Sequence, residues 1–540
     1  MSKACMMVPI GQVPEGGIMR RFNTTGLCVP RKHYMVDISG RVAQMRAMVD
    51  DGDYFCVNRA RQYGKTTALA ALRLALKDDY AVASLDFQAL SHESFRTEGT
   101  FARGLCRILL RTPGLTASMP PRARGAIDSL AQRDPDSIRL DDLFFALSAW
   151  CEGSERPVVL IIDEVDSATN NQVFLDFLAQ LRLQYLGREE DPSHPAFQSV
   201  VLAGVTDVKH LKAKIRPDSE SKVNSPWNIA ADFDVRMSFD EDDVAGMLDE
   251  YETDHATGMD VRAVAREIVG WTCGYPFLVS RICQLVDRHG LPWNREGVDA
   301  AVQKILSERN TLFDSLMGKL QDYPQLKQTL KEMLMEGRSF AYSPDQEEMS
   351  QLVMYGFVKE DGGRIRVANR LFETRLYNLF LSDEELRGSR LSSEGDLARS
   401  RFVQGGRLNM REVLEGFRRT YDQVFGPLVD RFPEKDGREL FLLYLKPVIN
   451  GTGNYYIEAQ TRDQTRTDVV VDYAGEQFVV ELKVWRGRSR HEEGERQLRG
   501  YLDRFGLDVG YMLSFNFNKH KEPGLRRVSV GDKVLWEETI

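Results

Sequence analysis

Short apolar runs recur through the first 210 residues of the chain and predict the strands of one sheet. They lie at residues 54–57, 80–87, 157–162 and 198–205. The third run is continuously apolar and rich in β-branched residues, which is typical of a strand covered on both faces in a parallel sheet. Apolar positions with helical spacing lie between the runs, at residues 40–50, 66–76 and 95–152, with a loop at 113–121. The pattern therefore predicts an α/β fold with a parallel sheet.

Beyond residue 235 the pattern changes. Residues 236–310 have helical spacing, and residues 320–381 predict a small helical unit ending in two short strands joined by Asp361-Gly362-Gly363. Such turn residues between strands favour a hairpin. Residues 382–407 are rich in Ser, Gly and charged residues without apolar periodicity, which predicts a linker. After a helix at 409–425, the order of elements is helix, three strands, helix and strand.

Composition limits the class of protein. At 540 residues the chain exceeds one core, so about two to four domains are expected. It has 42% hydrophobic and 28% charged residues, no apolar run near the ~20 residues of a membrane helix, and no signal-peptide pattern at its start. The seven cysteines are scattered and never spaced as CxxC, which argues against a disulfide framework or a zinc site. We therefore expect a cytoplasmic protein that does not contact a membrane.

Charge is unevenly distributed. The net charge is −9, yet residues 401–540 hold 23 Lys and Arg against 22 Asp and Glu. A surface that binds a polyanion is therefore expected toward the C-terminus.

A polar loop joins the first strand to a helix. It reads Asn58-Arg59-Ala60-Arg61-Gln62-Tyr63-Gly64-Lys65-Thr66-Thr67. Gly-Lys-Thr between strand and helix is typical of a phosphate-binding loop, whose amides and helix N-terminus face the phosphates. In that role the residues from Arg61 to Thr67 bind ATP, Lys65 reaches the β- and γ-phosphates, and the Thr66 hydroxyl ligates Mg²⁺. Arg59 replaces the first glycine of the motif, and because a Cβ constrains a tight turn we expect slow turnover.

Two carboxylates follow the run at 157–162. Asp163 and Glu164 lie where this strand ends, and in parallel α/β sheets ligands bind at the carboxyl ends of the strands. The phosphate loop lies at the same end of its own strand. Asp163 is therefore the candidate to hold Mg²⁺ through water, and Glu164 the candidate to polarise the attacking water. The alternative is a polar strand end that turns into a loop.

These segments, together with residues 225–230 and 272–278, resemble the AAA-like ATPases of bacteria, which are related to signal-transduction and archaeal-type P-loop ATPases. The resemblance covers roughly residues 20–385, and this family group often has Arg at the position of Arg59. It implies that Gly274 and Pro276, at the start of a lid helix, contact the nucleotide. It also implies that Thr206 senses the γ-phosphate, although Thr206 could instead be a helix or turn cap.

An arginine supplied by a neighbouring subunit is expected if the protein forms a homo-oligomer. Arg182, Arg188 and Arg216 lie in suitable regions. The sequence does not choose among them, and each could be a solvated surface charge.

The hairpin at 357–367 favours a winged helix. Winged helices often read DNA through the helix before the wing, but here residues 345–355 carry three acidic residues and no basic one. Because such a helix would repel phosphates, we expect a structural role for this module.

The C-terminal region contains a second set of candidate catalytic residues. Asp468 precedes Glu481 by thirteen residues, and Lys483 follows two residues later. A hairpin with a short turn would bring Asp468 and Glu481 together on adjacent strands, and would point Glu481 and Lys483 to one face. Converging carboxylates bind Mg²⁺, which polarises a scissile phosphate and helps to generate hydroxide.

This order of elements, with Asp468 and Glu481-Leu482-Lys483, resembles the PD-(D/E)XK nuclease superfamily, although Thr467 stands where the name motif has proline. The resemblance implies that Gln497 joins the catalytic site from the following helix and that Glu439 adds a metal-binding acid from the first. The alternatives are an exposed strand face with an ion pair, and a nuclease fold without activity.

The sequence thus predicts six segments. They are an N-terminal arm (1–30), a P-loop AAA-like ATPase core (31–235), a helical lid (236–310), a winged-helix-like module (311–381), a linker (382–407) and a C-terminal α/β restriction-endonuclease-like domain (408–540). The function expected is an ATPase that regulates a nuclease using Mg²⁺ or Mn²⁺ to cut DNA in defence against foreign nucleic acid. The alternatives are an oligomerising signalling switch whose C-terminal domain binds without cutting, and a transcription regulator.

Overall fold

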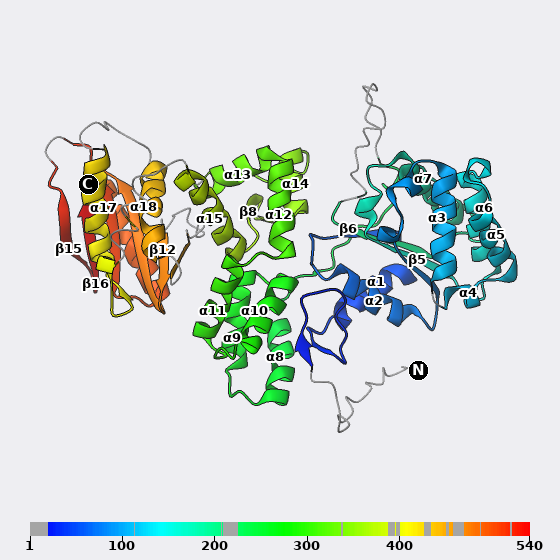
Figure 1. Ribbon diagram of the computed structural model, residues 1–540, viewed down its shortest axis with the longest axis horizontal. Helices are drawn as coiled ribbons and strands as arrows, with labels where there is room; N and C mark the ends of the chain where they lie inside the picture. The colour runs from blue at the N-terminus through cyan, green and yellow to red at the C-terminus, as the bar shows by residue number, and fades with distance from the viewer. Residues whose placement is uncertain are drawn as a thin grey trace. The chain divides into compact units, whose positions relative to one another are not determined.

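The computed structural model describes residues 20–112, 114–206, 208, 225–335, 338–386, 395, 400–425, 434–449, 453–456, 469–485, 488–518 and 521–540 (Figure 1). The chain divides into two compact units. The first extends to Asn58 and includes Gln62–Val269 and Gly274–Val298. The second contains Arg59–Arg61, Gly270–Cys273 and Asp299–Ile540. The domain limits given above remain predictions.

A parallel sheet organises the first unit. It contains β3 (Phe55–Asn58), β4 (Ala81–Asp86), β5 (Val158–Asp163) and β6 (Ser199–Gly204) in the order β3-β6-β5-β4. All three strand pairs are parallel. The parallel sheet predicted from the apolar runs is therefore confirmed. Because β6 lies between β3 and β5, its end is also flanked by the ends of these two strands.

Helices cover both faces of this sheet. Side chains of β5 alternate between two buried clusters: Val159 and Ile161 pack with α1 and α2, whereas Leu160 and Ile162 pack with helices on the other face. This alternation explains why the strand is apolar at every position. The helices are α1 (Ser39–Asp50) and α2 (Lys65–Leu76) on the first face, and α3 (Glu98–Arg111), α4 (Leu115–Ser118), α5 (Pro121–Gln132), α6 (Leu140–Gly153) and α7 (Gln172–Glu190) with the second cluster.

The helices that follow form the segment predicted as a lid. They are α8 (Glu241–His255), α9 (Val261–Thr272), α10 (Pro276–Arg288) and α11 (Arg295–Ser307). Two short parallel strands, β1 (Arg21–Phe22) and β2 (His33–Tyr34), lie against this segment. The rings of Phe22 and Tyr34 each lie 5.1 Å from the ring of Tyr251 on α8.

The first part of the second unit is helical and contains one hairpin. Its elements are α12 (Thr311–Asp322), α13 (Pro324–Leu334), α14 (Glu347–Met354), β7 (Val358–Asp361), β8 (Arg364–Val367) and α15 (Arg370–Leu386). The strands β7 and β8 are antiparallel, and the turn residues Gly362 and Gly363 have φ of 61° and 77°. Left-handed conformations at both positions are what a tight hairpin turn requires.

A six-stranded mixed sheet organises the rest of the second unit. Its order is β11-β12-β13-β14-β16-β15, with β13, β14 and β16 parallel to one another. The strands are β11 (Gly453–Tyr456), β12 (Val469–Tyr473), β13 (Glu476–Val484), β14 (Val509–Phe515), β15 (Gly524–Val530) and β16 (Lys533–Thr539). The helices are α17 (Met410–Phe425), α18 (Glu434–Ile449) and α19 (Arg488–Phe505), and a small hairpin of β9 (Val403–Gln404) and β10 (Arg407–Leu408) precedes them.

Two further observations concern the class of protein. None of the six cysteines in the described part of the chain forms a disulfide bond. Among the described residues, no helix has both the length and the apolar character needed to cross a bilayer.

Candidate functional sites

The predicted phosphate loop connects β3 to α2. Gly64, with φ of 81°, precedes the first residue of α2, and Gln62 is also left-handed with φ of 58°. Arg59 is not among the described non-glycine residues with positive φ. The structure therefore places the strained backbone position at Gln62, where a left-handed conformation costs about 1–2 kcal/mol, and not at Arg59.

The loop meets the acidic end of β5 through a direct hydrogen bond. The Thr66 hydroxyl donates to Asp163 Oδ2 at 2.8 Å, and the backbone N–H of Glu164 donates to Asp163 Oδ1 at 2.9 Å. Burial raises the pKa of Asp163, while these hydrogen bonds and the charge of Lys65 oppose that shift. A hydroxyl and a carboxylate held together beside a lysine are the oxygen ligands and counter-charge that Mg-nucleotide requires. The residues present therefore fit Mg²⁺ and ATP.

Asp166, which the sequence analysis did not single out, organises the end of β6. Its Oδ2 accepts the N–H of Val205 at 2.7 Å, and its Oδ1 accepts the N–H of Thr206 at 2.8 Å. The carboxylate therefore fixes the backbone that carries the candidate γ-phosphate sensor. The sequence signal was available, because Asp166 is the second acidic residue after β5, whose own last residue is Asp163. Glu164, with φ of 56°, lies between this anchor and Asp163.

The lid turn at residues 274–276 lies close to the phosphate loop. The Tyr275 ring packs edge-on against Tyr63, with 4.6 Å between the ring centroids, and Pro276 is the first residue of α10. Gly274 has φ of 70°, and a Cβ at this position would lie 1.8 Å from the carbonyl oxygen of Phe239. Glycine is therefore required for the turn that places Tyr275 on the loop.

Two of the three candidate trans-acting arginines can be compared. Arg188 donates to the carbonyls of Phe197, Gln198 and Gly52, each at 2.7 Å, so its guanidinium holds loops of its own unit together. Arg188 therefore has a structural role within its own unit. Arg182 is partly buried on α7, and Arg216 lies outside the described residues.

Three of the predicted nuclease residues, Glu481, Lys483 and Gln497, lie on β13 and α19. Glu481 is fully buried, and its Oε1 lies 2.8 Å from Lys483 Nζ. Gly494 on α19 lies against the Lys483 side chain, since a Cβ there would be 3.2 Å from Lys483 Cε. Gln497 follows one helical turn later and is partly buried, as is Glu439 on α18.

The prediction for this second site pairs Glu481 with Asp468 as metal ligands. Asp468 lies outside the described residues. Within the described ranges, no three His, Cys, Asp or Glu residues gather as a metal-binding cluster. The described donor set therefore supplies one buried carboxylate and one lysine.

Three residues that were not predicted from the sequence, Ser514, Glu537 and Arg526, lie on the strands of the same sheet that follow β13. Ser514 is the register partner of Lys483, and its hydroxyl donates to Glu537 Oε1 at 2.8 Å. Glu537 is 1% exposed, and its Oε2 accepts Arg526 Nε at 2.8 Å. Polar groups thus continue from Lys483 across β14, β16 and β15.

A parallel sheet with helices on both faces, a Gly-Lys-Thr loop and an acidic neighbouring strand end define a P-loop nucleotide-binding ATPase fold. Residues 32–378 match the model of the AAA-like domain family. This match covers more than half of the chain, and the protein belongs to the AAA-like domain family.

Individual similar proteins are distant. A curated relative, an uncharacterised WD repeat-containing protein of Synechocystis, is 23% identical over 249 residues, which are 43% of this chain and 20% of the relative. The chain thus matches about a fifth of that relative's length. Similar solved structures include a Walker-type ATPase of Pyrococcus abyssi (13% identity, TM-score 0.44, 63% of this chain and 96% of that chain) and the ORC2 protein of Aeropyrum pernix (13%, 0.36, 64% and 95%).

Proposed function

We propose that ATP binding and hydrolysis in the first unit control a Mg²⁺-dependent nuclease in the second, which cuts DNA and defends the cell against foreign nucleic acid. The observation that carries the ATPase part is the Thr66–Asp163 hydrogen bond, because it joins two motifs that are 97 residues apart at the ends of separate strands. Family membership supports the same assignment.

The roles at the nucleotide site follow from chemistry. The amides from Arg61 to Thr67 would bind phosphate oxygens at the N-terminus of α2, and Lys65 would neutralise charge on the β- and γ-phosphates. Thr66 and Asp163 would hold magnesium, and Glu164 would polarise the attacking water. Thr206, fixed through its N–H, would contact the γ-phosphate, with Gly274 and Pro276 closing the site.

The nuclease part rests on the ion pair between Lys483 and the fully buried Glu481, against which α19, the helix of Gln497, packs through Gly494. In this proposal Asp468 and Glu481 bind Mg²⁺ or Mn²⁺, Glu439 contributes an outer acid, and Lys483 orients the attacking water. The metal polarises the scissile phosphate, and the lysine steadies the developing charge. The higher share of cations in the C-terminal region supports a nucleic-acid substrate.

The test of the ATPase part compares two lysines at opposite ends of α2. Lys65→Ala is expected to abolish ATP binding, whereas Lys77→Ala, directly after the other end of α2, is expected to bind as the wild type does. Unchanged binding by Lys65→Ala would refute the nucleotide site.

The test of the nuclease part uses plasmid DNA with Mg²⁺ or Mn²⁺, with and without ATP. Glu481→Gln and Lys483→Ala should stop cleavage. Glu476→Gln should not, because Glu476 lies on the same strand but pairs with Arg407 at 3.1 Å. Cleavage that survives the first two substitutions would show that another site, or a contaminant, cuts the DNA.

One observation favours the second candidate function, a nucleotide-driven oligomerising switch whose C-terminal domain binds without cutting. Lys483 Nζ lies 2.8 Å from Glu481 Oε1, so this buried carboxylate has a cationic partner without a metal. This candidate predicts a homo-oligomer whose mass in solution depends on nucleotide, and no cleavage with any divalent metal.

A further inference from the structure

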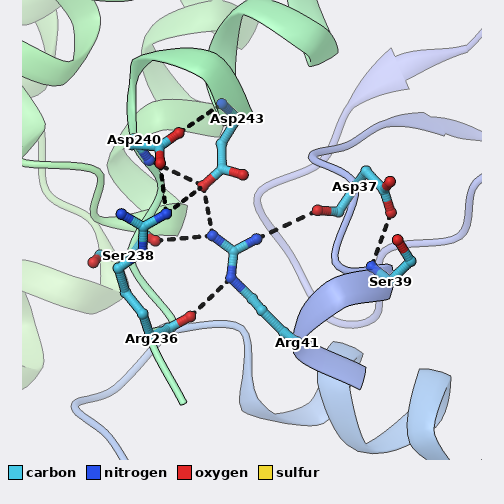
Figure 2. Close-up of polar contacts among 7 residues, drawn as sticks. All are labelled: Asp37, Ser39, Arg41, Arg236, Ser238, Asp240 and Asp243. Carbon is cyan, nitrogen blue, oxygen red and sulfur yellow. Dashed lines mark hydrogen bonds and ion pairs between the residues drawn. The ribbon is translucent and has the colours of Figure 1, made fainter. Parts of the chain in front are cut away.

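Arg41 on α1 is a buried cation at the junction between the ATPase core and the lid. It is 8% exposed, and Figure 2 shows its guanidinium pointing away from α1 toward the start of α8. Nε donates to the carbonyl of Arg236 at 2.8 Å, and Nη2 donates to the carbonyl of Ser238 at 3.0 Å and to Asp243 Oδ2 at 2.5 Å. Nη1 donates to the carbonyl of Asp37 at 3.3 Å. One side chain thus binds four acceptors on three segments.

Two of the four acceptors, the carbonyls of Arg236 and Ser238, belong to the strap that leads from the sheet to the lid, which we define as residues 236–239. Asp243 also accepts the N–H of Asp240 at 3.0 Å, in a capping box that begins α8 (Figure 2). The hydrogen bond from the Asp243 N–H, together with the ion pair that Arg236 forms with Asp240 at 2.5 Å, holds the pKa of Asp240 below its usual range. Arg41 therefore joins the strap and the first turn of the lid to α1 by hydrogen bonds, beside Met237 of the strap, which lies in the same buried cluster as Val42 and Met45 of α1.

The other side of the strap contacts the lid turn. The N–H of Phe239 donates to the carbonyl of Gly274 at 2.9 Å, and the ring of Phe239 lies 5.4 Å from the Arg41 guanidinium carbon. Gly274 is followed by Tyr275, whose ring packs on Tyr63 of the phosphate loop. A continuous set of contacts therefore runs from Arg41 through the strap and the lid turn to the phosphate loop.

We propose that Arg41 is a positioning residue of the ATPase: by fixing residues 236–239 it holds the lid turn against the phosphate loop. The inference rests on the proposed nucleotide site and adds a residue that touches neither nucleotide nor metal. Arginine is required because its planar group presents five donors in a fixed arrangement, whereas lysine offers three donors at one point. Lysine at this position would retain the charge and lose the simultaneous contacts.

The test compares two arginines of α1. Arg41→Lys is expected to weaken ATP binding about tenfold, a coupling in the usual range for linked sites, and to speed amide exchange at residues 236–239 and 274–276. Arg46→Lys is the matched control, because Arg46 pairs with Asp50 and Asp79 on the exposed side of α1. It should leave both measurements unchanged.

The outcomes separate positioning from simple stabilisation. If Arg41→Lys lowers the thermal midpoint but leaves ATP affinity and exchange in the strap within about twofold of wild type, the proposal is wrong. If the wild-type protein does not bind ATP, the proposed function fails, while the exchange measurement without nucleotide still tests the strap. If Arg41→Lys does not fold, Asp243→Asn takes its place, because it keeps the capping acceptor and removes only the charge. It should shift ATP affinity and amide exchange in the same direction by a smaller factor, and the absence of any shift would overturn the proposal.

Discussion

Removing the Asp166 carboxylate should release the end of β6 without unfolding the sheet. In Asp166→Ala the N–H groups of Val205 and Thr206 lose a charged acceptor held at 2.7 and 2.8 Å. A hydrogen bond to a charged group contributes about 1.5–3 kcal/mol, and because Asp166 is only partly buried we take the lower value, about 3 kcal/mol for the pair.

Hydrogen exchange measures this loss at the two amides concerned. A loss of about 3 kcal/mol corresponds to exchange roughly 100-fold faster at Val205 and Thr206, whereas the amides inside β5 should keep their protection. Asp166→Asn, which keeps one acceptor oxygen, should lose about half of this free energy. The turnover number for ATP should fall in both variants while binding persists, because Thr206 moves and Lys65 does not.

The matched control is Asp176→Ala. Asp176 lies on α7, and its carboxylate accepts a hydrogen bond from Gln172 of the same helix at 2.8 Å. Its removal should leave exchange at Val205 and Thr206 unchanged. Equal protection in Asp166→Ala and Asp176→Ala would refute the role assigned to Asp166.

Three further outcomes are expected. Burial raises the pKa of Glu538 to about 7 against the opposing charge of Arg418, so the folded state keeps a proton that the unfolded state loses. The free energy of unfolding should therefore fall by at most about 3 kcal/mol as pH rises from about 4.5 to about 7. If the difference in this free energy between wild type and Glu538→Gln does not change with pH, the prediction is wrong. Gly274→Ala should lower the stability of the lid by at least about 2 kcal/mol, since its Cβ would meet the Phe239 carbonyl, and an unchanged thermal midpoint would count against that contact. Gly363→Ala should cost the β7–β8 hairpin about 1 kcal/mol, detectable as faster exchange there, and equal exchange would show that the left-handed turn is not required.

The parts of the fold that were predictable are those encoded locally. The four strands of the first sheet appear as apolar runs because their side chains are buried, at every position in β5 and β6 and at alternate positions in β4, and the phosphate loop is a continuous segment. The strand order is not encoded in this way. The position of β6 between β3 and β5 depends on which strands pair, and no run of residues reports that choice.

The missed residues are those whose roles depend on distant partners. The sequence analysis ended the C-terminal fold at the strand now seen as β14 and omitted β15 and β16. Glu537 on β16 matters because Ser514 and Arg526 lie on its two neighbouring strands, and that pairing is set by register alone. The alternation within residues 524–539 and the Gly531-Asp532 turn could have predicted the hairpin, but not its place in the sheet.

Arg188 and Arg41 show the same limit for charged residues. A sequence presents an arginine as a charge, and the default expectation is solvent exposure. Here Arg41 donates to the carbonyls of Arg236 and Ser238, and Arg188 donates to that of Gly52, all far away in the chain, and those acceptors carry no residue-specific signal. Roles of this kind follow only from coordinates.

The two candidate sites share one electrostatic feature that connects their chemistry to stability. Asp163 is 9% exposed and Glu481 is fully buried, so each carboxylate has lost most of its hydration. A charged group in such a place needs a compensating cation, which Lys65 and Lys483 supply only in part, because a lysine is a single point charge. A divalent metal would supply the remaining positive charge, and its binding free energy would add to the free energy of folding. Mg²⁺ should therefore stabilise both units more than it stabilises a protein whose acidic residues are solvated. The reason is that the metal would bind the negative carboxylates of Asp163 and Glu481, whose charge is unfavourable when buried without it.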